Sequence, residues 1–488
     1  MNQRIERMKR ISTLIIVGLL LLQIACQTIT GPRPTQPAPA TPTPASPPTA
    51  TLPVATQPTA RPAATNIPET TPPGEANLAC VGLYGSGVTC IENNEWVNYN
   101  KNNADLGSDL VKDIAVCPGG ELLVLHTLGL NLFDGTQWRN YGQGWGSGSS
   151  EAVACATDGD FWVAHFRGAS HFHDGNWQTY PVKEVLSADP EAYDLVNDIA
   201  IAPDGAVWVV LVNGIAVFTE EEWTVYEEGT GFGDTYFFAR IAFDSRGDPW
   251  VISGGGLHHY DGLFWDFYPS QGFSVMPQGI AVDRQDRIWI GTLSGGLLLY
   301  ENQSWLTFTP QNSPLSSYNV NALAVDAAGR LWVGTTWGLH IVDGDTWTSY
   351  HISNSDLPDD AIAVIAVSGA GSALPAAQKK APGALTGRLV TPDGEALADV
   401  TIEICVETIY SSYRGATPCE GHPYTRDAVS DADGVFTIEN LPAGFYNLAV
   451  QTGDTWMLYS SRSSGSSEQL LIPAGETVDL GEIVVGQE

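Results

Sequence analysis

Short apolar segments and polar turns alternate through residues 78–368, and the alternation repeats. One complete copy spans residues 321–350, with apolar, β-branched and aromatic segments at 321–325, 331–335, 339–342 and 346–350. Gly or Asp separates each segment from the next, as is typical of β-strands joined by tight turns. The second and fourth segments carry large apolar groups at both odd and even positions, which predicts strands that are buried on both faces.

A Trp-x-x-Tyr motif, once Trp-x-x-Phe, marks the last strand of each copy and sets the period. The occurrences are Trp96/Tyr99, Trp138/Tyr141, Trp177/Tyr180, Trp223/Tyr226, Trp265/Tyr268, Trp305/Phe308 and Trp347/Tyr350. Successive Trp residues are 42, 39, 46, 42, 40 and 42 positions apart. A period near 42 residues with four short strands per copy predicts an all-β fold, a seven-bladed β-propeller with four-stranded blades.

The two ends of this region predict how the ring closes. The first copy, residues 78–99, contains the second, third and fourth strands but lacks the first. Residues 360–367 form a first strand that no other strand of the repeat follows. Three strands from the start and one from the end would complete one blade, a 3+1 closure that removes exposed sheet edges. We therefore expect the propeller to span residues 78–368.

Motifs in the later copies resemble the two-component-regulator propeller repeat. They are Asn354-Ser-Asp-Leu-Pro358, Ile280-Ala-Val-Asp283 and Gly329-Arg-Leu-Trp-Val-Gly-Thr-Thr-Trp-Gly-Leu339, within a match that is best at residues 278–350. The segment around Pro203, Asp204, Gly205 and Trp208 also looks like the repeats of streptogramin lyases. The first resemblance implies a sensory extracellular domain of the kind found in bacterial hybrid kinases. Neither resemblance transfers an activity by itself.

The N-terminus predicts export from the cell. Residues 1–26 begin with basic side chains and continue with an apolar run at 11–22, which is typical of a signal segment. The segment ends at Ile24-Ala25-Cys26, which resembles the end of a bacterial lipobox, although Gln23 stands where that motif prefers Leu. We expect lipidation of Cys26 and a position on the outer leaflet of a bacterial membrane. The alternatives are an uncleaved anchor or ordinary secretion.

Three further segments differ from the propeller in composition. Residues 27–77 are almost wholly Pro, Thr, Ala and Gln, which predicts a disordered tether with a reach on the order of 100 Å. Residues 369–383 are expected to be a linker. Residues 384–488 alternate apolar and polar positions between tight turns and resemble a carboxypeptidase-regulatory-like domain, which implies a transthyretin-like β-sandwich. In that family the domain usually accompanies function.

Seven cysteines fit an oxidising compartment, because lipidation of Cys26 would leave six for disulfides. Cys80 and Cys90 fall on two strands of one predicted hairpin, and Cys405 and Cys419 flank one excursion of the C-terminal region. We expect both of these pairs to form disulfides. The pairing of Cys117 with Cys155 stays open, because neighbouring first strands are not hydrogen-bonded partners.

Charge and motifs exclude several classes of function. The formal charge of −33, from 22 basic and 55 acidic residues, repels nucleic acid and disfavours anionic lipid. We expect contact with the membrane through the lipid anchor only. No Gly-x-Ser-x-Gly, His-Glu-x-x-His or P-loop motif is present in the sequence, so no catalytic residue and no cofactor are predicted. No metal site is predicted either, and His171, His173, His258 and His259 are interpreted as structural.

Candidate binding residues lie at or just after the ends of the second strands. These ends share a face with the long connections at 181–196, 227–239 and 269–278, and variable loops of this kind usually bind ligands. The candidate ligand-binding residues are Tyr84, His126, His165, Arg167, Asn213 and Trp337. This polar and aromatic set would suit a sugar or a peptide. The alternative interpretation is that His126 and His165 are ordinary rim side chains.

The sequence therefore favours a surface-tethered recognition protein whose propeller rim binds an extracellular glycan, peptide or partner protein. A link to a separate signalling system is one option. Two other functions stay open. One is a lyase or hydrolase that uses His126 and His165 as acid and base. The other is a purely structural module of the cell envelope.

Overall fold

A computed structural model describes residues 78–486 except 93, 147–148, 157–159, 183–184, 186–194, 220–221, 227–237, 271–275, 369–373, 379, 407–416, 420–424, 454 and 460–469. The expected export signal at residues 1–26, with Cys26, and the expected tether at 27–77 lie outside the described residues. No segment within the described residues forms a helix long and apolar enough to cross a membrane.

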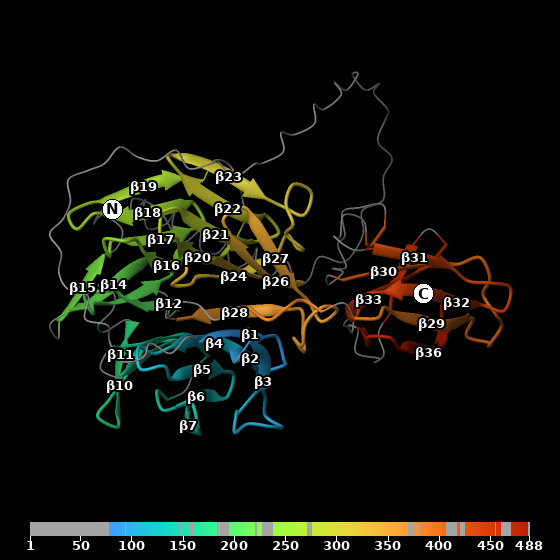
Figure 1. Ribbon diagram of the computed structural model, residues 1–488, viewed down its shortest axis with the longest axis horizontal. Coiled ribbons are helices and arrows are strands. Elements are labelled where there is room, and N and C mark those ends of the chain that lie inside the picture. Colours follow the sequence, from blue (N-terminus) through green and yellow to red (C-terminus); the bar gives the residue numbers. More distant parts are fainter. Residues whose placement is uncertain are drawn as a thin grey trace, which may run out of the picture. The chain divides into compact units, whose positions relative to one another are not determined.

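Seven four-stranded sheets make up the larger part of the described residues (Figure 1). One sheet joins β28 (Ile362–Val367) to β1 (Ala79–Leu83), β2 (Val88–Glu92) and β3 (Glu95–Tyr99). The next three are β4 (Val111–Val116), β5 (Leu122–His126), β6 (Gly129–Phe133), β7 (Trp138–Gly142); β8 (Ser150–Cys155), β9 (Phe161–His165), β10 (Gly168–His173), β11 (Asn176–Pro181); and β12 (Val196–Ile201), β13 (Val207–Leu211), β14 (Gly214–Thr219), β15 (Glu222–Tyr226). The last three are β16 (Phe238–Phe243), β17 (Pro249–Ser253), β18 (Gly256–Tyr260), β19 (Trp265–Pro269); β20 (Met276–Val282), β21 (Ile288–Leu293), β22 (Gly296–Glu301), β23 (Ser304–Phe308); and β24 (Val320–Val325), β25 (Leu331–Thr335), β26 (Gly338–Asp343), β27 (Thr346–Tyr350).

The first strand of each sheet lies against the first strands of two other sheets. Contacts run from β4 to β8, β12, β16, β20, β24 and β28 in turn, and β28 in turn contacts β4. β28 also pairs with β1 in antiparallel register, with Val367 opposite Ala79. Four-stranded sheets with their first strands side by side in this way are the architecture of a β-propeller. The expected all-β propeller fold is thus confirmed.

Apolar and aromatic side chains fill the space between neighbouring sheets. Every residue of β5, β9, β13 and β25 is buried, as their two-parity apolar pattern predicts. Trp162 on β9 meets Trp223 of the next sheet edge-on, with ring centroids 6.1 Å apart. Trp96 meets Tyr350 in the same manner at 5.3 Å. The Trp-x-x-Tyr motif is therefore a packing motif, because its rings join one sheet to the next.

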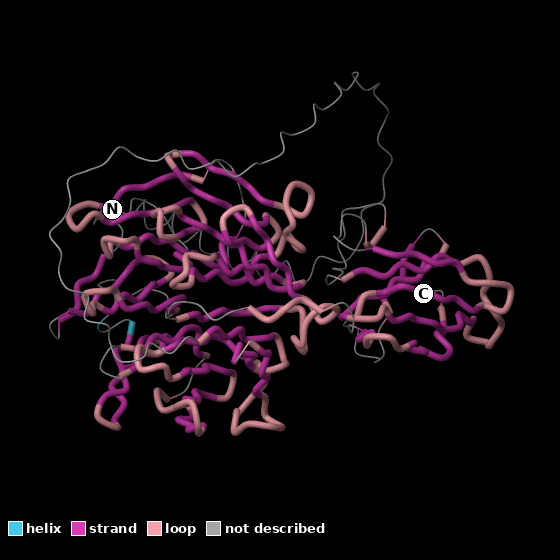
Figure 2. Tube along the Cα trace, in the orientation of Figure 1, coloured by secondary structure: helices cyan, strands magenta, loops and turns pink. Residues whose placement is uncertain are grey.

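The C-terminal region contains two more sheets, and Figure 2 shows that it too consists of strands and loops. One sheet has the order β32 (Val435–Leu441), β29 (Gly383–Val390), β36 (Thr477–Val484). The other has the order β31 (Thr425–Val429), β30 (Thr401–Cys405), β33 (Gly444–Thr452), β34 (Thr455–Leu458), with β35 (Leu470–Ile472) paired to β33. Leu385 and Phe436 of the first sheet pack with Ile404 and Leu448 of the second, so both sheets share one core.

Three disulfides are present within the described residues. Cys80–Cys90 joins β1 to β2, and Cys405–Cys419 fastens the end of β30 to a following loop. Cys117–Cys155, the pair that sequence reasoning left open, joins the residue after β4 to the last residue of β8, with Cα atoms 5.1 Å apart. This disulfide therefore links two neighbouring sheets.

Candidate functional site

A cavity of about 140 Å³ lies where the first strands of all seven sheets come together. Its lining residues come from β4, β8, β12, β16, β20, β24 and β28. We call this cavity the channel. Its charged lining residues are Lys112, Asp113, Glu151, Asp198 and Arg240. These charges come from four consecutive sheets, whereas β20, β24 and β28 contribute amides and aliphatic groups.

A β-bulge in each first strand determines which side chains line the channel. In every case the pairing register skips one residue near the start of the strand. The skipped residues are Lys112, Glu151, Asn197, Ala239, Gln278, Asn321 and Ala363. A bulge leaves its extra residue outside the ladder and re-aims side chains. Five of these seven residues consequently line the channel.

Hydrogen bonds from channel residues join one first strand to the next. Asp113 Oδ2 on β4 accepts a bond of 2.8 Å from the Val153 backbone N–H on β8. Asp198 Oδ2 on β12 accepts one of 3.0 Å from the Ile241 N–H on β16. Asn321 Nδ2 on β24 donates to the carbonyl of Ile362 on β28 at 2.9 Å. The polar groups of the channel thus also hold the sheets in place.

The channel carries both signs of charge in close proximity. Lys112 Nζ lies 3.6 Å from Glu151 Oε1, and both side chains are about one-third exposed. Burial raises the pKa of Asp113 to about 7, and the carboxylate of Asp198 adds to this, while the Val153 N–H and Arg240 oppose it. Burial likewise raises the pKa of Asp198, opposed mainly by the charge of Arg240. Near neutral pH the channel can therefore gain or lose a proton at Asp113.

Replacement of Asp113 by Asn is expected to reduce the pH dependence of stability. Because its pKa is raised from 3.8 to about 7 on folding, the folded chain holds a proton that the unfolded chain releases. The stability that the protonated Asp113 carboxyl contributes is fully present below pH 4 and is lost as pH rises through 7. Urea unfolding at pH 5 and pH 8 should show a smaller difference for Asp113→Asn than for the wild type. Asp134→Asn should not change this difference, because hydrogen bonds from Thr136 and Gln137 hold the pKa of Asp134 well below pH 5. If the free energy of unfolding differs between pH 5 and pH 8 by the same amount in wild type and Asp113→Asn, the raised pKa of Asp113 is contradicted.

The two histidines predicted for the rim are buried. His126 is 1% exposed, accepts a bond from the Leu128 N–H at Nδ1 and donates from Nε2 to Asn131 Oδ1 at 2.6 Å. His165 is 2% exposed, and its Nε2 lies 2.9 Å from Ser170 Oγ. Burial lowers the pKa of both imidazoles. Their hydrogen bonds tie the second strand to the third within one sheet.

The other four predicted residues differ in exposure. Tyr84 is 57% exposed, and Arg167, whose backbone φ of 96° fits its tight turn, is also exposed. Asn213 is half-buried, with no hydrogen-bond partner for its Oδ1 among the described residues. These four residues come from different sheets. The binding role of all six predicted residues stays a prediction.

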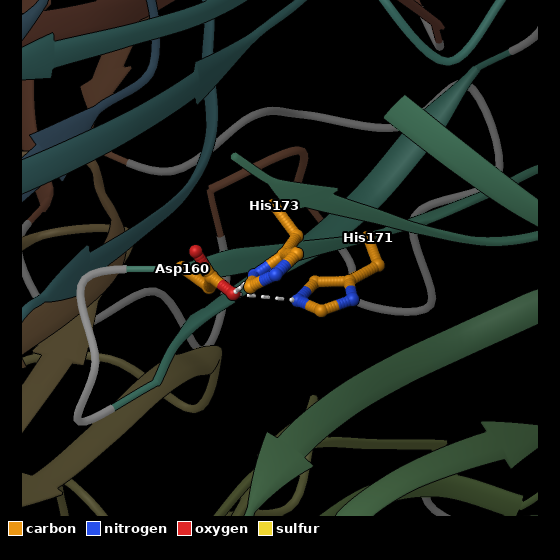
Figure 3. A group of neighbouring side chains, drawn as sticks. All are labelled: Asp160, His171 and His173. Carbon is orange, nitrogen blue, oxygen red and sulfur yellow. Dashed lines mark hydrogen bonds and ion pairs between the residues drawn. The ribbon is translucent and has the colours of Figure 1, made fainter. Parts of the chain in front are cut away.

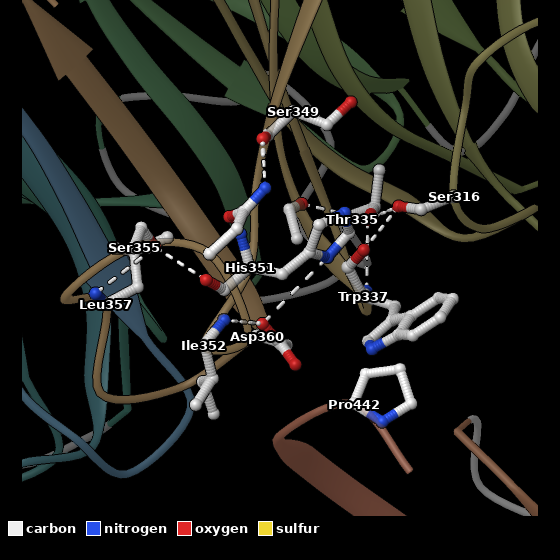
Figure 4. Close-up of polar contacts among 12 residues, drawn as sticks. Ser316, Thr335, Trp337, Ser349, His351, Ile352, Ser355, Leu357, Asp360 and Pro442 are labelled. Carbon is white, nitrogen blue, oxygen red and sulfur yellow. Dashed lines mark hydrogen bonds and ion pairs between the residues drawn. The ribbon is translucent and has the colours of Figure 1, made fainter. Parts of the chain in front are cut away.

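Trp337, the last of the six, belongs to a polar cluster at the turn between β25 and β26 (Figure 4). Its backbone N–H donates to Thr335 Oγ1 at 3.0 Å, and its backbone carbonyl accepts a bond from Ser316 Oγ. Nearby, Asp360 Oδ1 accepts a bond of 2.6 Å from the Ile352 N–H. Burial raises the pKa of Asp360 to about 7 and lowers that of His351 to about 4. These contacts give Trp337 a structural task besides any binding role.

Sequence reasoning missed the channel residues, although the chain carries a signal for them. A charged or amide residue occupies the second position of several first strands that end in apolar residues, as at Lys112, Glu151 and Asn321. Such a residue would be costly inside a dry core unless it were paired or hydrated. A polar position that recurs once in each blade therefore indicates a hydrated surface to which several blades contribute.

Among the described residues, two groups of side chains outside the channel have the composition of metal ligands. They are Asp160, His171 and His173, and Asp244, Asp248 and His259. In the second group Arg246 Nη2 lies 2.9 Å from Asp244 Oδ2 and 3.0 Å from Asp248 Oδ2. The guanidinium of Arg246 thus already forms an ion pair with both carboxylates.

The fold and the channel together define a β-propeller protein with a polar central cavity. A family described as "Two component regulator propeller" matches residues 314–337, which include β24 and β25. No curated protein matches the sequence.

Several solved structures are similar to this chain. The extracellular domain of a hybrid two-component system from B. thetaiotaomicron is 13% identical over 82% of this chain and 66% of its own, with a TM-score of 0.45. Virginiamycin B lyase from Staphylococcus aureus is 13% identical over 53% of this chain and 91% of its own, with a TM-score of 0.43. A second extracellular domain from B. thetaiotaomicron is 14% identical over 54% of this chain, with a TM-score of 0.43. The match covers only 36% of that domain. At such identities no ligand or activity transfers to this chain.

Proposed function

We propose that the protein is an extracellular recognition protein whose propeller binds a polar ligand at the mouth of the channel. The observation that carries the proposal is the set of charged residues on consecutive first strands, above all the paired and partly exposed Lys112 and Glu151. A surface with both donors and acceptors suits a glycan or a peptide. The exposed Tyr84 and Arg167 are additional candidates for contact with such a ligand.

The size of the channel limits what can enter. At about 140 Å³ it is smaller than the pockets of about 300–1,000 Å³ that enclose drug-sized ligands. A single end group, such as one sugar ring or one side chain, fits this volume. The rest of the ligand would lie across the mouth of the channel.

The proposal includes a closed, seven-bladed propeller and a C-terminal sandwich. The seven four-stranded sheets, the run of contacts from β4 back to β28 and the β28–β1 pairing support the closed ring. The shared core of the two C-terminal sheets supports a transthyretin-like sandwich of carboxypeptidase-regulatory-like type. In this organisation residues 369–383 link the two domains.

The proposed location is the outer leaflet of a bacterial membrane, with Cys26 lipidated and residues 27–77 as the tether. Three disulfides support an oxidising compartment. The family match to a two-component-regulator propeller at residues 314–337 agrees with an extracellular sensory role. A separate signalling protein would then receive the signal.

Lys112→Ala and Glu151→Gln are expected to weaken ligand binding while leaving the melting temperature nearly unchanged. Both side chains are about one-third exposed, and such ion pairs contribute little to stability. The full-length chain is screened on glycan and peptide arrays, and each hit is then titrated against both variants. Loss of one charged hydrogen bond should lower the affinity about tenfold or more.

Arg388→Ala provides the matched control, because Arg388 forms an ion pair with Glu482 in the C-terminal region. Its affinity for each hit should equal that of the wild type. Silence on both arrays, or hits that bind Lys112→Ala and Glu151→Gln as well as the wild type, would count against recognition at the channel. Turnover that depends on His126 and His165 would instead favour the lyase or hydrolase.

A further inference from the structure

Three side chains of the β8–β11 sheet converge outside the channel (Figure 3). Asp160 directly precedes β9, and His171 and His173 lie on β10. Asp160 Oδ2 is 3.3 Å from His171 Nε2 and also contacts His173 Nδ1. Figure 3 shows both imidazole rings next to the same carboxylate. One nitrogen or oxygen atom from each residue lies within 4.8 Å of the others.

Strand geometry explains why these residues meet. His171 and His173 are two positions apart on one strand, so their side chains share a face of the sheet. His171 pairs with Trp162 on β9, and Asp160 is two positions before Trp162. All three side chains therefore point to one face. The ring of His171 is also stacked on Trp162 at 4.2 Å, which fixes its orientation.

In three other sheets the turn between the first two strands contains its own cation. Arg246, Arg287 and Arg330 bind Asp244, Asp283 and Asp326, with N–O distances of 2.9, 2.6 and 2.6 Å. In the β16–β19 sheet His259 pairs with Trp250 as His171 does with Trp162, and Arg246 Nη2 lies 3.4 Å from His259 Nε2.

The corresponding turn of the β8–β11 sheet has a different composition. Residues 156–160 read Ala-Thr-Asp-Gly-Asp and contain no Lys or Arg, and Ala156 stands where the other turns have their first Asp. A second imidazole, that of His173, replaces the guanidinium as the neighbour of the carboxylate. The chain thus places a carboxylate and two imidazoles at a position where three other sheets hold an Arg.

Two imidazoles and one carboxylate are the donor set of borderline divalent metals such as Zn²⁺. Bonds of about 2.0–2.1 Å in tetrahedral geometry separate ligand atoms by about 3.3 Å, which is the distance between Asp160 and His171. His173 Nε2 lies 3.4 Å from Asp174 Oδ2, so this imidazole has an outer carboxylate that can orient it while Nδ1 binds metal. The His173 side chain is 59% exposed, which allows it to adjust.

We propose that Asp160, His171 and His173 bind a divalent transition-metal ion of the Zn²⁺ type. The fourth coordination position is open to water or to a donor from a partner molecule. The site is separate from the proposed binding function of the channel. His171 and His173, for which the sequence predicts a structural role only, are ligands in this proposal.

Titration of the full-length chain, purified without a histidine tag, with Co²⁺ and then Zn²⁺ tests this site. One metal ion should bind per chain, with the visible absorption of tetrahedral Co²⁺. His173→Ala should lower the affinity at least about tenfold, the smallest loss typical when even an outer partner is removed. Asp174→Asn should lower it about tenfold. Zn²⁺ should raise the melting temperature of the wild type but not that of His173→Ala.

His259→Gln is the matched control, because His259 occupies the same strand position in the sheet where Arg246 is present. Its metal affinity should equal that of the wild type. Absence of stoichiometric binding would overturn the proposal. So would equal affinities for wild type and His173→Ala, or a loss of binding in His259→Gln alone. The melting temperatures without metal show whether each variant is folded.

Discussion

Replacing both Cys117 and Cys155 by Ser is expected to lower the free energy of unfolding by about 4 kcal/mol. The disulfide closes a loop with a sequence separation of 38 residues and joins two neighbouring sheets. Without it, the unfolded chain gains the conformational freedom of that loop, and the two first strands lose a covalent link. Urea unfolding of the oxidised protein and of the double variant measures the difference.

The Cys80–Cys90 disulfide offers an internal comparison. It spans only 10 residues and lies between two strands of one hairpin, so its removal should cost less, about 3 kcal/mol. The order of the two effects is a stronger test of the dependence on loop length than either magnitude. If replacing Cys80 and Cys90 by Ser lowers the free energy of unfolding more than replacing Cys117 and Cys155 does, loop length does not determine how much each disulfide stabilises the fold.

Asp326→Ala is expected to destabilise the fold by about 3–5 kcal/mol, the range for breaking a buried ion pair. Asp326 Oδ2 accepts bonds from Arg330 Nε at 2.6 Å and from Trp332 Nε1 at 2.9 Å, and its Oδ1 accepts two backbone N–H groups. Removal of the carboxylate leaves a guanidinium and an indole N–H without their acceptor. Asp326→Asn, which keeps an acceptor but loses the charge, should fall between wild type and Asp326→Ala.

The same residue gives a pH dependence of defined sign. Burial alone would raise the pKa of Asp326, but bonds from Trp332 and Arg330 outweigh it and hold the pKa below the usual 3.8. The stability from this residue is thus present above pH 4 and is lost as pH falls through the lowered pKa. Asp326→Ala should lack this acid-sensitive component. Asp343→Ala, at the exposed last residue of β26 in the same sheet, should change the stability by less than about 0.5 kcal/mol. A similar loss in Asp343→Ala would contradict the role assigned to Asp326.

The repeat predicted much of the fold because its signals are local. The Trp-x-x-Tyr period and the Gly and Asp turns each depend on a few adjacent residues, and four-stranded sheets follow from them. The segment at 360–367 contained β28, which pairs with β1 as the missing first strand required. The sequence does not determine the Cys117–Cys155 pair, because the two residues lie at the ends of strands that are not hydrogen-bonded to each other. First strands of neighbouring sheets lie close enough at their ends for Cα atoms 5.1 Å apart.

The channel could not be predicted from the alternation of polar and apolar residues. A bulge adds one residue to each first strand, and a shift of one residue exchanges the faces of a strand. Lys112 and Glu151 therefore reach the channel from positions that an ideal strand would direct elsewhere. His126 and His165 end their second strands, which predicts a place at the rim, whereas hydrogen bonds to Asn131 and Ser170 accompany their burial.

The pairing of β1 with β28 also determines how the protein responds to mechanical force. Ala79 lies opposite Val367, and the Ser368 N–H donates to the carbonyl of Leu78 at 2.8 Å, so the chain enters and leaves this ladder at the same end. A pulling force applied between the segments before residue 78 and after residue 368 would act first on the Ser368–Leu78 hydrogen bond. Hydrogen bonds would then break one after another, as in a zipper, and not all together as in shear. The Cys80–Cys90 bond would hold β1 to β2 while β28 peels away.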